Sequence, residues 1–114
     1  MKHFLFRVNK GKENAWRDWC SYLCTHKVEA EKTMKAENCI YERSVMYKRN
    51  EEYYVVGTSF FDGEPKKADM NIEINKLHNK AKKECLGAAI AVFTGEFKMP
   101  PEYDILYEFD LRSV

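Results

Sequence analysis

The stretch CIYERSVMYKRNEEYYVVGTSFF, residues 39–61, decides the fold class. From Cys39 to Tyr47 it sets Cys, Tyr, Val and Tyr against Ile, Glu, Ser and Met, and from Tyr53 to Phe61 it is rich in Tyr, Val, Thr and Phe. Period-two alternation with β-branched and aromatic residues is typical of strands. Because residues 48–52 between the two runs are all polar, the stretch predicts an antiparallel hairpin.

An amphipathic helix is predicted on each side of this hairpin. The first runs from Glu13 to about Lys35, with a lapse in its pattern around Lys27. Its apolar stripe, at steps of three, four and seven, consists of Trp16, Trp19, Cys20, Leu23, Cys24, Ala30 and Met34. The second helix follows Pro65, which fits a position near a helix start, and Gly87 fits its C-cap. Its stripe consists of Met70, Ile74, Leu77, His78, Ala81 and Cys85. Such stripes pack against a sheet.

Two more strands are predicted near the ends of the sequence. Residues 3–8 alternate, with Phe4, Phe6 and Val8 on one side, and residues 104–111 place Ile105, Tyr107, Phe109 and Leu111 on one side. Residues 88–93 are apolar and fit either a short strand or an extension of the second helix. Residues 94–103 contain one glycine and two prolines and predict a loop.

The resulting element order is β-α-β-β-α-β within one domain, residues 1–114. Split βαβ units of this kind form a ferredoxin-like βαββαβ sandwich, in which two helices cover one face of a four-stranded antiparallel sheet. We therefore expect an α+β protein with this fold. A chain of 114 residues suits one such domain and can bury a core without disulfides or a structural metal.

Composition excludes several classes of function. A formal net charge of +1 gives no electrostatic footprint for nucleic acid. The N-terminal apolar run is too short for a signal-peptide core, and no stretch approaches the roughly 20 apolar residues of a membrane helix. We therefore expect no membrane association and a cytoplasmic protein. There Cys20, Cys24, Cys39 and Cys85 would be reduced thiols that serve as small apolar core residues, and without a CxxC pair they predict no metal site.

Because helices cover one face of the sheet, the other face must meet water or a partner. We expect Phe4, Phe6, Val8, Ile105, Tyr107 and Phe109 on the helix side. The opposite set is then Leu5, Arg7, Leu106, Glu108, Ile40, Glu42, Ser44, Met46, Tyr54, Val56 and Thr58. A face this apolar suggests association, so we expect a homodimer that packs two sheets face to face.

The element order, together with the segment RVNKGK at residues 7–12 followed by Trp16 and Trp19, resembles the dimeric α/β-barrel superfamily. In particular, residues 6–19 and 78–86 are similar to an uncharacterised family of small bacterial proteins with that fold. The resemblance implies a ferredoxin-like dimer. It implies no single reaction, because the superfamily includes antibiotic-biosynthesis monooxygenases, haem-degrading enzymes, dye-type peroxidases and proteins without known activity.

His78 is the leading candidate for chemistry. It lies on the apolar stripe of the second helix, where a histidine in a cleft could bind haem iron or shuttle protons. A core-edge histidine with one satisfied hydrogen bond is the structural interpretation, and it is favoured. His26 is expected to be solvated, and His3 to be structural or exposed. The three histidines do not have a metal-ligand spacing.

Charged and aromatic residues supply the other candidates. Arg7, Glu42 and Glu108 could meet on one face of the sheet, where they would hold an anionic substrate or, in the favoured interpretation, form an ion-pair network that fixes the dimer. Trp16 and Trp19 could wall a pocket for a flat aromatic ligand, although at this spacing they also fit plain core. No phosphate loop, nucleophile elbow or HExxH motif is present.

Two hypotheses follow for function, and no cofactor can be named. The first is a homodimeric protein that binds a small, partly aromatic ligand in a helix–sheet cleft. The alternative is a monooxygenase-like or haem-binding enzyme with His78 as ligand or base. The enzyme hypothesis requires an open cleft that reaches His78, whereas the binding hypothesis requires only a cavity.

Overall fold

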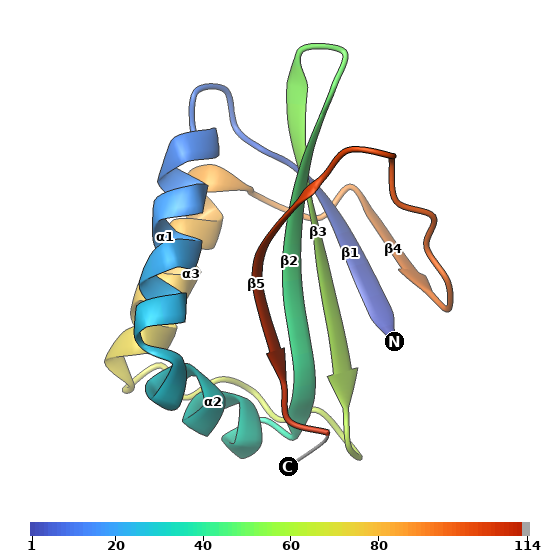
Figure 1. Cartoon of the computed structure of the whole chain (residues 1–114). Coiled ribbons are helices and arrows are strands. Elements are labelled where there is room, and N and C mark those ends of the chain that lie inside the picture. The colour runs from blue at the N-terminus through green and yellow to red at the C-terminus, as the bar shows by residue number, and fades with distance from the viewer. Residues whose placement is uncertain (113–114) are drawn as a thin grey trace.

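The computed structural model describes residues 1–112 and has an α+β architecture. Figure 1 shows three helices gathered on one side of an antiparallel sheet. In chain order the elements are β1 (Lys2–Arg7), α1 (Glu13–Thr25), α2 (Lys27–Ala36), β2 (Cys39–Arg49), β3 (Glu52–Phe61), α3 (Glu73–Cys85), β4 (Ala91–Thr94) and β5 (Asp104–Asp110). The α+β class and the central hairpin are as predicted.

The expectation of a four-stranded, ferredoxin-like sandwich with two helices is wrong, because the sheet has five strands and three helices cover it. The strand order is β4-β1-β3-β2-β5. The additional strand, β4, comes from the apolar segment that fitted either a strand or a helix. It hydrogen-bonds along β1, whose backbone groups at the sheet edge would otherwise lack partners. The strand that begins at Asp104 lies at the opposite edge, next to β2.

The third helix arises because the first predicted helix is interrupted at His26. This residue has φ −118° and ψ 38°, outside the helical region, and it ends α1 and precedes α2. Its ring stacks on Tyr22 at 3.9 Å, and its Nδ1 is hydrogen-bonded to the Tyr22 carbonyl oxygen at 2.9 Å. The lapse in the apolar stripe at Lys27 marks this break. The second predicted helix also begins later than expected, at Glu73, well beyond Pro65.

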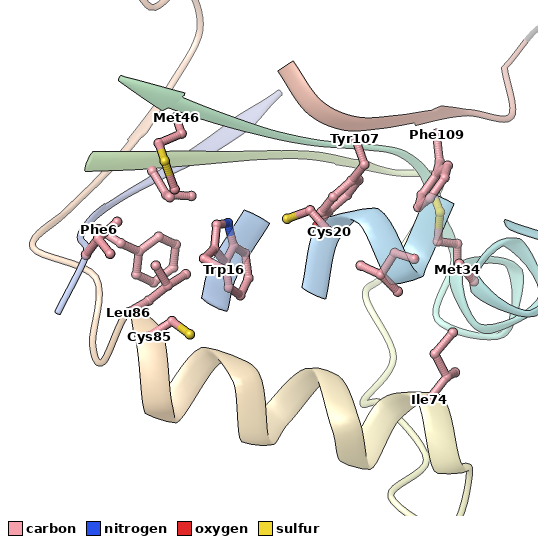
Figure 2. Packing of buried hydrophobic residues seen from close by; sticks show 14 of the residues in the cluster. Phe6, Trp16, Cys20, Met34, Met46, Ile74, Cys85, Leu86, Tyr107 and Phe109 are labelled. Carbon is pink, nitrogen blue, oxygen red and sulfur yellow. The ribbon is translucent and has the colours of Figure 1, made fainter. Parts of the chain in front are cut away.

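The core lies between the helices and one face of the sheet. Figure 2 shows Phe6, Met46, Tyr107 and Phe109 with side chains on the helix side of the strands, around Trp16 and Cys20. Phe6, Val8, Tyr107 and Phe109 are buried there, as predicted.

The predicted faces are wrong for part of β2 and β5. Glu42, Ser44 and Met46 lie on the helix side, and so does Leu106, which packs against the core. Ile105 is 51% exposed on the opposite face. Two causes account for this. Both alternating sets of β2 contain large apolar residues, and a register shift after Ser44 in the pairing with β5 reverses the alternation locally.

The face of the sheet away from the helices, the open face, is partly covered by the chain itself. Residues 95–103 connect β4 at one edge to β5 at the other and cross the sheet (Figure 1). His3 is buried on this face, where Nδ1 is bonded to the Thr58 hydroxyl at 2.8 Å and Nε2 to the Gly95 carbonyl oxygen at 2.7 Å. The Phe97 ring lies 6.1 Å from the His3 ring. His3 is therefore a structural residue that anchors the crossing segment.

All four cysteines carry free thiols. Cys20, Cys39 and Cys85 are buried and serve as core residues, whereas Cys24 is exposed, contrary to the expectation for it. Burial raises the pKa of the Cys20 and Cys39 thiols, that of Cys39 to about 11, so both remain uncharged at neutral pH.

Within residues 1–112, no helix is both long enough and apolar enough to span a membrane.

The β2–β3 hairpin closes through the two residues Asn50 and Glu51, which have φ of 52° and 67°. A two-residue turn with positive φ at both positions favours Asn-Gly, and glutamate is strained at the second position. We expect Glu51→Gly to raise the free energy of unfolding by about 0.5–1 kcal/mol. The Lys48–Glu51 ion pair that is lost is exposed and contributes little. Urea unfolding followed by circular dichroism measures the change.

Glu52→Gly is the matched control for this turn. Glu52 lies in β3, opposite Arg49, and its φ is not positive. Glycine there should lower stability, because it loosens a strand. Equal effects of the two substitutions would contradict the assignment of strain to Glu51.

Candidate functional site

A cavity of about 360 Å³ lies between the helices and the sheet. It exists because α3 packs mainly against α1 and α2 and not directly on the strands. Its rings come from Phe4, Phe6, Trp16, Phe61, Tyr107 and Phe109. Gly57 of β3 contributes bare backbone, and a Cβ built on it would meet only the Phe6 ring, at 3.7 Å. The size and the apolar wall are typical of a small-molecule site.

Glu42 is one of four charged residues that line this cavity, which we call the cleft; the others are Glu37, Arg43 and Lys82. Glu42 projects from β2 to the helix side, and the Tyr107 hydroxyl donates a hydrogen bond of 2.6 Å to its Oε1. Burial, and then the negative charge of Glu42, raise the pKa of the Tyr107 phenol well above its usual value. Tyr107 therefore stays protonated and holds the Glu42 carboxylate in place as a hydrogen-bond donor.

His78 lines the same cleft from α3. The Trp19 indole Nε1 donates a hydrogen bond of 2.9 Å to His78 Nδ1. Because an indole N–H can only donate, Nδ1 must be the unprotonated nitrogen, and the neutral ring carries its proton on Nε2. Burial lowers the pKa of His78, against a smaller opposing influence of the Glu42 charge, so the ring is neutral at pH 7. His78 is thus a fixed hydrogen-bond donor.

Ser44 and Glu37 also line the cleft. Its remaining polar residues are Thr33, Arg43, Thr58, Ser59, Asn75, Asn79 and Lys82. Ser44 is buried, and its hydroxyl accepts a hydrogen bond of 3.2 Å from Trp16 Nε1. Burial, and then the charge of Glu42, raise the pKa of Glu37 to about 7. The Glu37 carboxyl group therefore takes up a proton near neutral pH.

The structure brings together three of the six predicted site residues, Trp16, Glu42 and His78, around the cleft. Trp19 stands behind His78 and stacks on Tyr22 at 5.3 Å, so it positions the imidazole and does not line the cavity. Trp16 and Trp19 therefore both orient a polar partner, although only Trp16 forms part of the cavity wall.

Arg7, Glu42 and Glu108 do not form one cluster. Arg7 is exposed and lies 3.6 Å from the Glu52 carboxylate. Glu108 is opposite Arg43 in the sheet and accepts a hydrogen bond from the Tyr41 hydroxyl on the open face. Glu42 is on the helix side, because successive residues of a strand point to opposite faces.

Tyr107, Ser44 and Glu37 were not predicted as site residues from the sequence. Tyr107 was assigned to the core as a ring. A signal was present: a tyrosine in an inward-facing apolar set carries a hydroxyl that needs a buried partner, and only a polar residue on the same face can supply one. Residues 1–112 contain no group of three His, Cys, Asp or Glu side chains arranged to hold a metal ion.

Residues 1–104 match a family of unknown function, DUF6176. The chain belongs to that family. The match includes Glu42 and His78 and ends at the first residue of β5, before Tyr107. Neither the curated proteins nor the solved structures contained a match to the chain.

The bond from Trp19 to His78 can be tested through the tautomer it selects. We expect ¹⁵N NMR of the intact protein at pH 7 to show His78 as the neutral ring with the proton on Nε2. Trp19→Phe keeps an aromatic ring and removes the donor, so both tautomers should then be populated. Trp16→Phe removes an indole that bonds to Ser44 and is the matched control. A His78 spectrum unchanged by Trp19→Phe would contradict the assignment.

Proposed function

We propose that this protein binds a small, partly aromatic molecule in the cleft between its helices and its sheet. The observation that carries the proposal is the cavity of about 360 Å³, with an aromatic and aliphatic wall and a few fixed polar groups, Glu42, Ser44 and His78. Ligand sites combine an apolar wall with a small number of placed polar groups in this way. The wall supplies affinity, and the polar groups orient the ligand.

The state of His78 favours binding over the alternative, an oxygenase-like or haem-binding enzyme. A haem ligand or a general base needs an unprotonated ring nitrogen. In His78 that nitrogen, Nδ1, already accepts the hydrogen bond from Trp19. The remaining nitrogen, Nε2, carries a proton, and a donor at this place suits recognition of a ligand oxygen.

Substitutions at Gly57 test the proposal, because they fill the cleft without disturbing the sheet. The first step is a thermal-shift screen of small aromatic compounds against the wild-type protein, with native mass spectrometry of the same preparation to detect retained ligands. Gly57→Leu should abolish binding of every compound that stabilises the wild type. It should also keep or raise the melting temperature of the free protein, because a strand gains a side chain whose Cβ meets only the Phe6 ring.

Ser21→Leu is the matched control, since it adds an apolar side chain of the same size at an exposed position of α1. Binding should survive it. Unchanged binding in a folded Gly57→Leu variant would place the ligand elsewhere and contradict the proposal.

The proposal includes a homodimer formed through the open face and a cytoplasmic location. Two exposed apolar side chains on that face support association, namely Ile105 at 51% and Phe60 at 39% exposure, and both neighbour buried residues of β2. The four free thiols support a reducing compartment.

Charge on the open face tests the dimer. We expect size-exclusion chromatography with light scattering to give twice the subunit mass of 13.5 kDa. Ile105→Glu should shift the equilibrium toward the monomer by at least about tenfold, since a charge in an apolar interface costs more than about 1.4 kcal/mol. Val28→Glu, at an exposed position of α2, is the control. A wild-type monomer at high concentration would remove this part of the proposal.

A further inference from the structure

The Glu42 carboxylate has no cationic partner in the cleft. Five ion pairs form within residues 1–112, and none includes Glu42. Its one hydrogen-bonding partner there is the neutral phenol of Tyr107. Carboxylates enclosed by apolar walls are usually paired with a cation, because removal of a charge from water is costly.

The charge of Glu42 acts on several groups around it. Burial is the larger cause of the raised pKa values of Glu37, Cys39 and Tyr107, and the charge of Glu42 adds to it; for His78 that charge opposes the lowering of the pKa by burial. These groups come from different elements, so the charge of Glu42 acts across the cleft and not along one strand. Each of the thiol, phenol and carboxyl groups responds by holding its proton, and none supplies a positive charge.

Two cations, Lys82 and Arg43, also line the cleft, but neither forms an ion pair with Glu42. The Lys82 ammonium lies 5.6 Å from the centre of the Phe6 ring, which it faces. Arg43 follows Glu42 in the chain, so its side chain points to the opposite face, where Thr58 and Glu108 are its neighbours across the sheet. Within residues 1–112, Glu42 therefore lies in a cleft that contains cations but is paired with none of them.

We propose that the cleft recognises an organic cation, a protonated primary amine carried on an aromatic body, with Glu42 as its counter-ion. This inference rests on the proposed function and names the chemical class of the ligand. The rings of Phe4, Phe6, Trp16 and Phe61 offer faces for the flat body and for cation–π contact with the ammonium. The free Nε2–H of His78 fits an oxygen on the same molecule, and a second cation there would be repelled by the donor.

Three probes of similar shape separate charge from shape. They are 2-phenylethylamine, 2-phenylethanol and 3-phenylpropanoate, which share a ring and a two-carbon arm and carry a positive, a neutral and a negative head. We expect isothermal titration calorimetry on the intact protein to give the amine at least about tenfold tighter binding than the alcohol. The propanoate should bind more weakly than the alcohol, since it meets the charge of Glu42.

Glu42→Gln keeps the shape of the side chain and removes its charge, and Glu108→Gln makes the same change on the open face. The first variant should bring the amine and the alcohol to equal affinity, while the affinity for the alcohol changes less than about twofold. The second should leave all three affinities unchanged, because Glu108 lies outside the cleft. Circular dichroism melting confirms that each variant is folded.

Each result of this experiment decides the inference. Equal binding of amine and alcohol by the wild type, or an amine preference that survives Glu42→Gln, overturns it and leaves the proposed function standing. Failure of all three probes to bind also overturns it, and the screen with Gly57→Leu then decides separately whether the cleft binds any ligand. If Glu42→Gln does not fold, Tyr107→Phe takes its place. This substitution removes the hydrogen bond to the Glu42 carboxylate, so it must change the preference for the amine over the alcohol without changing the affinity for the alcohol.

Discussion

The pairing of β2 with both β3 and β5 is the constraint on which the cleft depends. Its register sets Ser44 opposite Gly57 on one side and opposite Tyr107 on the other, and it sets Glu42 opposite Ser59 and Phe109. Because residues in register share a face, Glu42, Ser44, Gly57 and Tyr107 all lie under the helices. A slip of one residue would exchange them for Arg43, Val45 and Thr58 and remove Glu42 and Ser44 from the cleft.

The polar groups of the cleft are held by partners that are themselves rigid. Tyr107 orients Glu42, Trp16 orients Ser44, and Trp19 orients His78. Each hydrogen bond runs between different elements, so the network also joins both α1 and β5 to the rest of the fold. A hydrogen bond to a charged group contributes about 1.5–3 kcal/mol, and the loss of one partner exposes the full desolvation cost of the other. Such a network is preorganised, and a ligand would meet groups that already point correctly.

The sequence allowed part of this to be predicted, and the physical reasons for the division are clear. The hairpin at residues 39–61 and the helical stripes could be predicted because their periodic patterns are regular and extend over many residues. Strand β4 was not, since four residues are too few to distinguish a strand from a helix, and its partner, β1, is distant in sequence. The face of β2 could not be predicted because both of its alternating sets contain large apolar residues. Glu42 was selected by residue type but assigned to the wrong face, with Arg7 and Glu108. His78 was found because a histidine interrupts an apolar stripe, whereas the Trp19 bond that decides its chemistry joins residues 59 apart in the sequence.

The position of α3 connects the fold to the cleft. A helix that packed directly on β1 and β3 would fill the space above Gly57. Here the buried residues of α3 are Ile74 and Cys85, near its two ends, and the helix packs against α1. Its middle turn, which carries His78, thus remains free to face the cleft. The same arrangement leaves Phe4 and Phe61 only partly covered, so aromatic surface is retained next to an unpaired carboxylate. Packing alone would favour closure of this space with larger side chains. The proposed occupant would account for an open cleft that combines aromatic rings with a carboxylate outside any ion pair of residues 1–112, whereas the requirements of folding alone do not.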